Sequence, residues 1–375
     1  MAGIYFHFPF CKKACTYCNF HFSTVLKNKN NLIQAMFLEL NLRKDFFESE
    51  KIESIYFGGG SPSIMKANQI GEFILKVKEL FKVSNSVEIT LELNPEDASM
   101  EYLEELIKFN VNRLSVGVQS FFNDDLKLIN RVHDSKKASE ALYQVKKVFE
   151  NFSIDLIYGL PNSNLLKWKK NLRKALSFNP PHLSCYALTV EPKTMLSHQI
   201  KLGKVKPVNE SLIKDQYDYL IGFMESLGYE NYEFSNFSIQ GKHSINNTAY
   251  WEGKSYLGIG PAAHSFDGNL VRSWNINQNN NYIKAIKNKK LPLRLEKLSK
   301  KDRYNESVMT GLRTSKGISL DNIKKHYGES YFNYLKINSE KKIFSNDLYW
   351  RDGNLCVSKE SKFLTDGLAS ELFIL

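Results

Sequence analysis

The chain contains no apolar run long enough to cross a membrane as a helix. Such a helix needs about 20 predominantly apolar residues, whereas the apolar segment near the N-terminus, Gly3–Phe10, is much shorter and contains a histidine. There is also no basic stretch leading to a cleavage site of small residues, which is the pattern of a secretory signal peptide. From these features we expect a cytoplasmic protein.

Cysteine is scarce, with five residues among 375, and the odd count argues against a fold held together by disulfide bonds. Two of the five, Cys185 and Cys356, stand alone in the sequence and are expected to be buried as small apolar side chains. Apolar residues make up 42% and charged residues 24% of the chain, which excludes a disordered protein. The length corresponds to roughly two or three domains.

An excess of basic residues gives the chain a formal net charge of +11. A charge of this size permits contact with nucleic acid or with an anionic membrane surface. Lysine and arginine are spread along the whole chain, however, and form no dense basic block. We therefore favour a compositional origin, expect no specific nucleic-acid partner, and keep peripheral membrane contact as an alternative.

Six short runs of apolar, β-branched or aromatic residues in the first half of the chain predict strands. They are Gly3–Phe8, Ser54–Phe57, Val87–Leu93, Arg113–Val118, Ser153–Tyr158 and His182–Leu188. Amphipathic helical patterns lie between them, as in residues 70–81, where apolar side chains recur at spacings of three and four. This alternation predicts a parallel sheet, in either an open or closed α/β barrel or a doubly wound fold.

Polar residues and glycines collect where the predicted strands end. Gly58–Gly60 follow the second strand, Glu92 lies near the end of the third, Gln119 follows the fourth and Asp155 lies on the fifth. Active sites of α/β barrels are built at this end of the strands. Because an unpaired carboxylate is costly to bury, Glu92 and Asp155 are predicted to contact a ligand.

The chain divides by composition into three predicted units. Residues 1–190 form the α/β core, 191–296 form an aromatic-rich extension without a clear pattern, and 297–375 form a C-terminal module. The module has helical patterns and a hairpin, which together predict a winged-helix-like fold. Its predicted elements are helices at Asn305–Leu312, Leu320–His326 and Tyr331–Leu335, the hairpin Leu348–Val357, and a last helix at Glu360–Phe373.

Three cysteines follow the first strand with three and then two residues between them: Cys11, Cys15 and Cys18. One interpretation is a zinc site in which His7 or His21 supplies the fourth ligand. Another is a disulfide with one free thiol, which a reducing compartment disfavours. A third is an iron–sulfur cluster in which one iron lacks a protein ligand. The spacing alone leaves these interpretations open.

The cysteine spacing, combined with the glycines after the second strand, resembles the radical S-adenosylmethionine (SAM) superfamily. The signature of that superfamily is Cys-x3-Cys-x2-Cys with an aromatic residue before the last cysteine, here Tyr17. The resemblance implies a partial (β/α)6 TIM-like barrel. It also implies that Cys11, Cys15 and Cys18 hold a [4Fe–4S] cluster, and that SAM binds the fourth iron and is cleaved there by one electron.

Further blocks resemble the coproporphyrinogen dehydrogenase-like group of this superfamily. They are Ile4–Cys11, Gly58–Ser63, Glu92–Pro95, Gly117–Phe121, Arg131–His133, Asp155–Pro161 and Leu257–Pro261. Within the group, the chain is most similar to the HemW family of haem chaperones. Matched position by position, the resemblance assigns SAM contacts to Tyr5, Gly59, Gly60, Ser61, Glu92, Gln119, Arg131 and Asp155.

The resemblance also bears on the choice between chaperone and enzyme. The dehydrogenases carry a fourth cysteine at the position of Phe20, so Phe20 favours a chaperone that binds haem and delivers it to haem-accepting proteins. The alternative is an oxygen-independent coproporphyrinogen III dehydrogenase. The haem-binding block of the family begins with histidine, and Asn246 takes its place here. His243 or His264 is then the candidate haem ligand, since imidazole is a good axial ligand.

Overall fold

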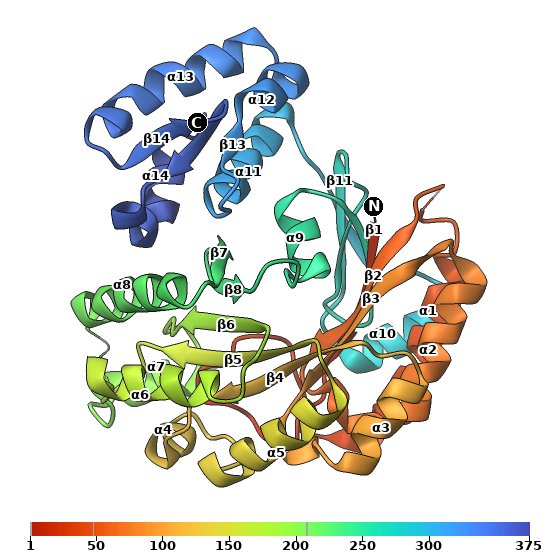
Figure 1. Ribbon diagram of the computed structural model, residues 1–375. Coiled ribbons are helices and arrows are strands. Elements are labelled where there is room, and N and C mark those ends of the chain that lie inside the picture. The colour runs from red at the N-terminus through yellow and green to blue at the C-terminus, as the bar shows by residue number, and fades with distance from the viewer. Residues whose placement is uncertain (1, 48, 208) are drawn as a thin grey trace.

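The computed structural model describes residues 2–47, 49–207 and 209–375. Its centre is a twelve-stranded sheet in which six parallel strands stand side by side in chain order (Figure 1). They are β1 (Ala2–Phe8), β2 (Ile52–Gly59), β3 (Val83–Leu93), β4 (Arg113–Gln119), β5 (Phe152–Tyr158) and β6 (His182–Ala187). All six predicted strands are confirmed. A doubly wound sheet would reverse its order part-way, so the sequential order identifies an open α/β barrel.

Helices connect the parallel strands and cover the outer face of the sheet (Figure 1). They are α1 (Lys29–Leu42), α2 (Ala67–Leu80), α3 (Met100–Lys108), α4 (Asn123–Leu128), α5 (Ser135–Val148) and α6 (Leu165–Leu176). Successive side chains of a strand point to opposite faces. Thus Phe6 of β1 packs outward against Phe73 of α2, whose ring also stacks on Phe37 of α1. Each such buried aromatic contributes roughly 1.5–3 kcal/mol to the free energy of folding.

The aromatic-rich region extends both edges of the same sheet. Strand β8 pairs antiparallel with β6, and strand β9 pairs in parallel with β1. Its elements are α7 (Met195–Lys201), α8 (Glu210–Ser226), β7 (Glu230–Glu233), β8 (Asn236–Ser238), α9 (Ile245–Trp251), β9 (Ser255–Ile259), β10 (His264–Phe266), β11 (Val271–Asn275), α10 (Asn279–Lys287) and β12 (Leu293–Lys297). All six of these strands have only three to five residues, which is too few to show a strand period in the sequence.

The C-terminal module has a hydrophobic core of its own and a three-stranded sheet in the order β13-β15-β14. Its elements are α11 (Lys300–Leu312), β13 (Ile318–Ser319), α12 (Leu320–Tyr327), α13 (Glu329–Phe344), β14 (Leu348–Arg351), β15 (Asn354–Val357), the 3-10 helix η4 (Lys359–Leu364) and α14 (Thr365–Glu371). The predicted hairpin is confirmed, and its turn residues Asp352 and Gly353 have φ values of 48° and 74°, as a type I′ turn requires. The prediction of one continuous helix over Glu360–Phe373 was wrong, because the 3-10 helix η4 precedes α14.

The module sits over the ends of the parallel strands at which β1 and β6 begin (Figure 1). Hydrogen bonds and ion pairs join it to the barrel, including Arg272 with Glu306 at 2.8 Å and Ser315 N with the Tyr232 carbonyl at 3.0 Å. A cleft of about 1160 Å³ lies between them. Within the described residues, no helix combines the length and the apolar character that crossing a bilayer requires.

Candidate functional site

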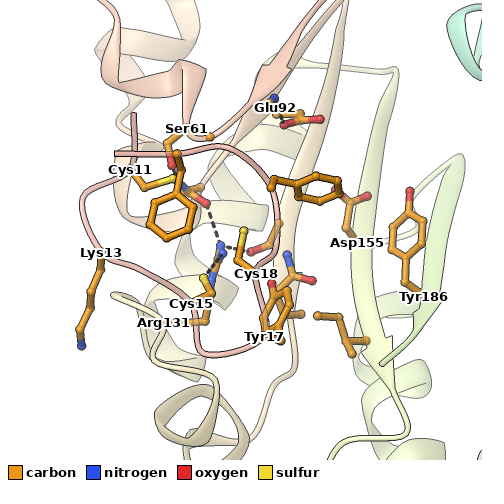
Figure 2. A pocket seen from close by; sticks show the side chains of 18 of the residues that line it. Cys11, Lys13, Cys15, Tyr17, Cys18, Ser61, Glu92, Arg131, Asp155 and Tyr186 are labelled. Atoms are coloured by element: carbon orange, nitrogen blue, oxygen red, sulfur yellow. Dashed lines mark hydrogen bonds between the residues drawn. The ribbon is translucent and has the colours of Figure 1, made fainter. Parts of the chain in front are cut away.

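A cavity of about 640 Å³ opens where the parallel strands end, and Figure 2 shows side chains that line it. The C-terminal module lies at the other end of the strands (Figure 1). The loop after β1 forms one wall, and the ends of β2 to β6 form the floor and the other walls. Every residue predicted to hold the cluster or SAM, except Tyr5, lines this cavity. The fold therefore brings together side chains that lie up to 144 positions apart in the sequence, from Cys11 to Asp155.

The three cysteines lie on the loop that joins β1 to α1. Backbone hydrogen bonds close this loop, from Cys11 N to the Ser23 carbonyl at 3.0 Å and from Thr16 N to the Ile129 carbonyl at 3.2 Å. All three thiols are unpaired and half-buried. Burial raises the pKa of the Cys11 thiol to about 11. A metal centre would therefore have to displace a proton from this thiol on binding.

The donor set of the loop fits an iron–sulfur cluster. In such a cluster each thiolate binds a different iron, so the sulfur atoms need not converge on one point. Within the part of the chain that is described, no three His, Cys, Asp or Glu side chains are grouped closely enough to hold a single ion. His7, a candidate fourth ligand of a zinc site, is buried. Its ring nitrogens lie 3.3 Å from Tyr5 Oη and 3.2 Å from the His21 carbonyl.

Arg131 fastens the segment after α4 to the floor of the cavity. Its Nη2 donates to Asn94 Oδ1 at 2.7 Å and to the Gly117 carbonyl at 2.8 Å, while Nη1 lies 3.6 Å from Cys15 Sγ (Figure 2). Asn94 in turn donates to Ser61 Oγ at 2.7 Å. The contacts fix the guanidinium next to the cysteine loop. The sequence places Asn94 with Glu92 among the polar residues at the end of the third predicted strand, but the predicted SAM contacts do not include it.

Glu92 lies at the end of β3, inside the barrel. Its carboxylate accepts hydrogen bonds from Tyr56 Oη at 3.0 Å and from Gly59 N at 3.2 Å. Burial, followed by the nearby Asp155 carboxylate, raises the pKa of Glu92 to about 7. A carboxyl group with this pKa can exchange a proton near neutral pH and still accept hydrogen bonds from a ligand hydroxyl.

Asp155 projects from β5 on the side of the cavity away from the cysteine loop, close to Tyr186 (Figure 2). Its carboxylate accepts hydrogen bonds from Ser115 Oγ at 2.8 Å and from Ser153 Oγ at 3.1 Å. Burial raises its pKa. Glu92 and Asp155 are thus held by protein donors and also line the cavity, which leaves oxygen lone pairs for a ligand.

Gln119 has a backbone conformation that non-glycine residues rarely adopt, with a φ of 68°. It ends β4 just after an irregularity in the pairing with β5. Strained residues of this kind cluster at functional sites, and the strain turns Gln119 toward the cavity that it lines.

Tyr5 is placed apart from the other predicted residues. It lies on β1 inside the barrel, where its ring stacks on Tyr56 with the ring centres 5.9 Å apart. Tyr56 lines the cavity and Tyr5 does not. The exposed Phe20 lines the cavity mouth together with Phe22. Sequence reasoning also passed over Tyr56 and Tyr186, whose aromatic character made them indistinguishable from core residues.

Asn246 is buried in α9 and is part of the internal structure. Its Oδ1 accepts a hydrogen bond from Ser54 Oγ at 3.3 Å, and its backbone N donates to Glu88 at 3.2 Å. The two alternative histidines are more accessible. His243 Nε2 lies 3.0 Å from a Glu230 oxygen, whereas the exposed His264 stacks on Trp274 with ring centres 5.7 Å apart.

Comparison with known proteins agrees with this geometry. The profile of the Radical SAM superfamily matches residues 5–175, and that of the HemN C-terminal domain matches 298–364. The chain is 33% identical to the haem chaperone HemW of Lactococcus lactis over 97% of both chains, and 31% identical to HemW of Bacillus subtilis over 92% of this chain and 93% of that one. This protein belongs to the HemW family of radical SAM proteins.

A vertebrate relative and a solved structure extend the comparison. Radical S-adenosyl methionine domain-containing protein 1, a mitochondrial protein of Danio rerio, is 32% identical over 70% of this chain and 60% of its own length. The structure of coproporphyrinogen III oxidase (HemN) from Escherichia coli superposes with a TM-score of 0.86, at 22% identity, over 99% of this chain and 90% of that one. The likeness to HemN confirms the barrel and the helical C-terminal module.

Proposed function

We propose that this protein holds a [4Fe–4S] cluster through Cys11, Cys15 and Cys18 and binds SAM in the same cavity. The observation that carries the proposal is that three unpaired thiols share one cavity with two half-buried carboxylates from other strands. Membership of the radical SAM family supports both cofactors. When bound, such a cluster supplies an electron for reductive cleavage of SAM.

The cavity offers complementary groups for each part of SAM. Arg131 lies beside the cysteine loop and suits the SAM carboxylate, because guanidinium–carboxylate contacts are charge-assisted. Gly59, Gly60 and Ser61 bring backbone close to the cysteine loop and suit the methionine moiety. Glu92, Gln119 and Asp155 suit the SAM ammonium and ribose hydroxyls. Tyr5 supports Tyr56 in this arrangement, because its ring stacks on that of Tyr56, which lines the cavity.

The cofactor proposal is tested by anaerobic reconstitution of the full chain. The wild type should contain about four irons and four sulfides per chain and show cluster absorbance, and a Cys11, Cys15, Cys18 triple alanine variant should lose both. Glu92→Gln and Asp155→Asn should weaken SAM binding in equilibrium dialysis while the iron content stays unchanged. Zinc in place of iron by elemental analysis would contradict the cluster.

The same protein is proposed to be a haem chaperone that delivers haem to haem-accepting proteins. Support comes from two HemW relatives that match over more than nine-tenths of this chain. Since Asn246 is buried and a carboxamide is a poor haem ligand, we assign axial ligation to a histidine. His264 is the better candidate, because it makes no side-chain hydrogen bond within the described residues, whereas His243 is engaged by Glu230.

Haem titration tests this assignment. The wild type should develop a Soret band, which His264→Ala should weaken more than His243→Ala does. The haem-loaded wild type should then transfer its haem to a haem-free globin when the two proteins are mixed. If protoporphyrinogen forms from coproporphyrinogen III in the presence of SAM and a reductant, the protein is a dehydrogenase and the chaperone proposal fails.

Two further properties belong to the proposal. We place the protein in the cytoplasm, which its unpaired cysteines support. We divide it into a barrel core at 1–190, an extension at 191–296 and a C-terminal module at 297–375. The separate hydrophobic core of the module supports the last boundary.

A further inference from the structure

A chain of hydrogen bonds runs from Asp155 through the barrel interior to the opposite end of the strands. Ser153 Oγ donates to Asp155 Oδ1 at 3.1 Å, and His182 Nδ1 lies 2.8 Å from the same hydroxyl. His182 Nε2 then lies 2.8 Å from Tyr232 Oη. Ser153 and His182 are completely buried, and Tyr232 is 5% exposed. The mechanism proposed for the cavity does not use Ser153, His182 or Tyr232.

The hydrogen-bond chain ends at the cleft between the barrel and the C-terminal module. Tyr232 and His243 both line this cleft, and their rings are stacked with centres 4.2 Å apart. The Tyr232 hydroxyl also accepts a weak hydrogen bond from Ser244 N at 3.4 Å. It therefore still has its own proton to donate.

The direction of each hydrogen bond in the chain depends on the tautomer of His182. Burial lowers the pKa of His182 well below its usual value, so the ring is neutral and has one donor and one acceptor. If Tyr232 donates to Nε2, then Nδ1 carries the proton and donates to Ser153. The Ser153 oxygen has a second lone pair that can accept from Ser184 Oγ, 3.0 Å away. The Ser153 hydroxyl is then free to donate its own proton to Asp155.

The other tautomer has the opposite effect. If Nε2 carries the proton and donates to Tyr232, then Nδ1 accepts a hydrogen bond from the Ser153 hydroxyl. Asp155 loses that donor and keeps the hydrogen bonds from Ser115 and Ser184. Tyr232 thus controls, through His182, how many donors hold the Asp155 carboxylate.

We propose that His182 is a positioning residue for Asp155, held by Tyr232 in the Nδ1–H tautomer so that Ser153 directs its proton to the carboxylate. This inference rests on the proposed function, in which Asp155 binds SAM. Partners that fix a ring tautomer and orient a ligand-binding group typically change affinity by 10- to 100-fold in metal sites. A loss of about tenfold in SAM affinity is the expected size here.

Several other ionisable groups face the two ends of the chain, and a pH profile must account for them. Those around Asp155 and His182 are Glu92, Arg113, Tyr56, Tyr186, Cys185 and His243, and those around Tyr232 are Arg113, Glu233 and Glu88. Tyr232→Phe substitutes none of these groups and removes only the Tyr232 hydroxyl, which makes it the informative change.

The test uses reconstituted full-length protein and compares Tyr232→Phe with Tyr217→Phe. Tyr217 is also a buried tyrosine. Its hydroxyl donates to the Phe234 carbonyl at 3.2 Å and takes no part in the hydrogen-bond chain from Asp155 to Tyr232. Tyr232→Phe should weaken SAM binding about tenfold and shift its pH profile, whereas Tyr217→Phe should leave both unchanged. ¹⁵N NMR of the histidine rings in SAM-free protein should show Nδ1–H at His182 in the wild type and a mixed tautomer in Tyr232→Phe.

Substitution of His182 itself gives a second measurement. The amide of His182→Asn reaches the position of Nδ1 and should retain SAM affinity, whereas that of His182→Gln reaches Nε2 and should not. The inference is overturned if the wild type already carries Nε2–H, or if Tyr232→Phe and Tyr217→Phe bind SAM equally. Should the wild type fail to bind SAM at all, the proposed function fails instead, and the ring spectra still report on the tautomer.

Discussion

Gly60 packs directly against the backbone of Phe10, the residue before the first cysteine of the loop. Gly60 N donates to the Phe8 carbonyl at 2.9 Å, and Ser61 N donates to the Phe10 carbonyl at 2.7 Å. A Cβ at Gly60 would stand 2.7 Å from the Phe10 oxygen and 2.9 Å from its nitrogen. The loop therefore owes its position over the cavity to the absence of a side chain at Gly60.

Gly60→Ala should consequently displace the cysteine loop. The atoms that a methyl group would meet are backbone atoms, which cannot rotate away, so we expect a loss of about 1–3 kcal/mol in the free energy of unfolding and a lower iron content after reconstitution. Gly222→Ala is the matched control, because a Cβ there meets nothing within 4 Å in the middle of α8. That variant should gain about 0.5–1 kcal/mol. Equal iron content in the two variants would contradict the account.

Arg131→Lys tests whether the planar guanidinium is needed beside the cysteine loop. Lysine keeps the charge but cannot reproduce contacts with Asn94 and Gly117 while also presenting a fork to a carboxylate. We expect SAM affinity to fall about 10- to 100-fold, as the loss of a charge-assisted hydrogen bond implies. Arg173→Lys, on the exposed face of α6, should bind SAM like the wild type. Isothermal titration calorimetry with SAM measures the affinity of both variants, and equal affinities would show that the planar guanidinium is not needed.

The pKa of Glu92 predicts how stability of the SAM-free protein depends on pH. The folded-state pKa of about 7 lies above the ordinary value of 4.5, so between these values the folded protein binds the proton that the unfolded chain has released. Stability therefore falls as pH rises from about 4.5 to 7, by about 3 kcal/mol for this group.

Glu92→Gln removes that titration. The free energy of unfolding of the variant relative to the wild type should rise between pH 5 and pH 8, as urea denaturation at several pH values will measure. A difference that stays constant across this range would show that Glu92 keeps its ordinary pKa.

The sequence correctly predicts those site residues whose positions follow from the geometry of parallel strands. Because parallel strands end on the same edge, Glu92, Gln119 and Asp155 had to meet near the loop after β1, and the structure places all three on one cavity. Tyr5 shows the limit of the argument. Strand alternation puts its side chain inside the barrel, but whether it or a neighbour reaches the cavity depends on the packing of Tyr56, which no pattern along one strand reveals.

The region 191–296 yielded no predicted elements, and the last helix was predicted incorrectly, because both depend on contacts beyond the local sequence. The strands of the region 191–296 are stabilised by pairing with β1 and β6, far away in sequence, and carry little local signal of their own. The last helix was predicted to be continuous from Glu360 to Phe373. The structure shows a 3-10 helix up to Leu364, where the Thr365 hydroxyl bonds to the Lys362 carbonyl at 2.6 Å.

The C-terminal module should tolerate change on one face of α13 and not on the other. Leu335 is completely buried in the core of the module, whereas Ile337, two residues later, is 66% exposed. Leu335→Ala should lower the free energy of unfolding by about 2–5 kcal/mol through lost burial and a cavity, and Ile337→Ala should change it by less than about 0.5 kcal/mol.

Because the module lies at the end of the barrel opposite the cysteine loop, both variants should keep the iron content and SAM affinity of the wild type below their unfolding temperatures. Urea denaturation followed by circular dichroism, with iron analysis of the same samples, measures both quantities. Loss of the cluster in Leu335→Ala while the barrel is still folded would mean that the module supports the cavity directly.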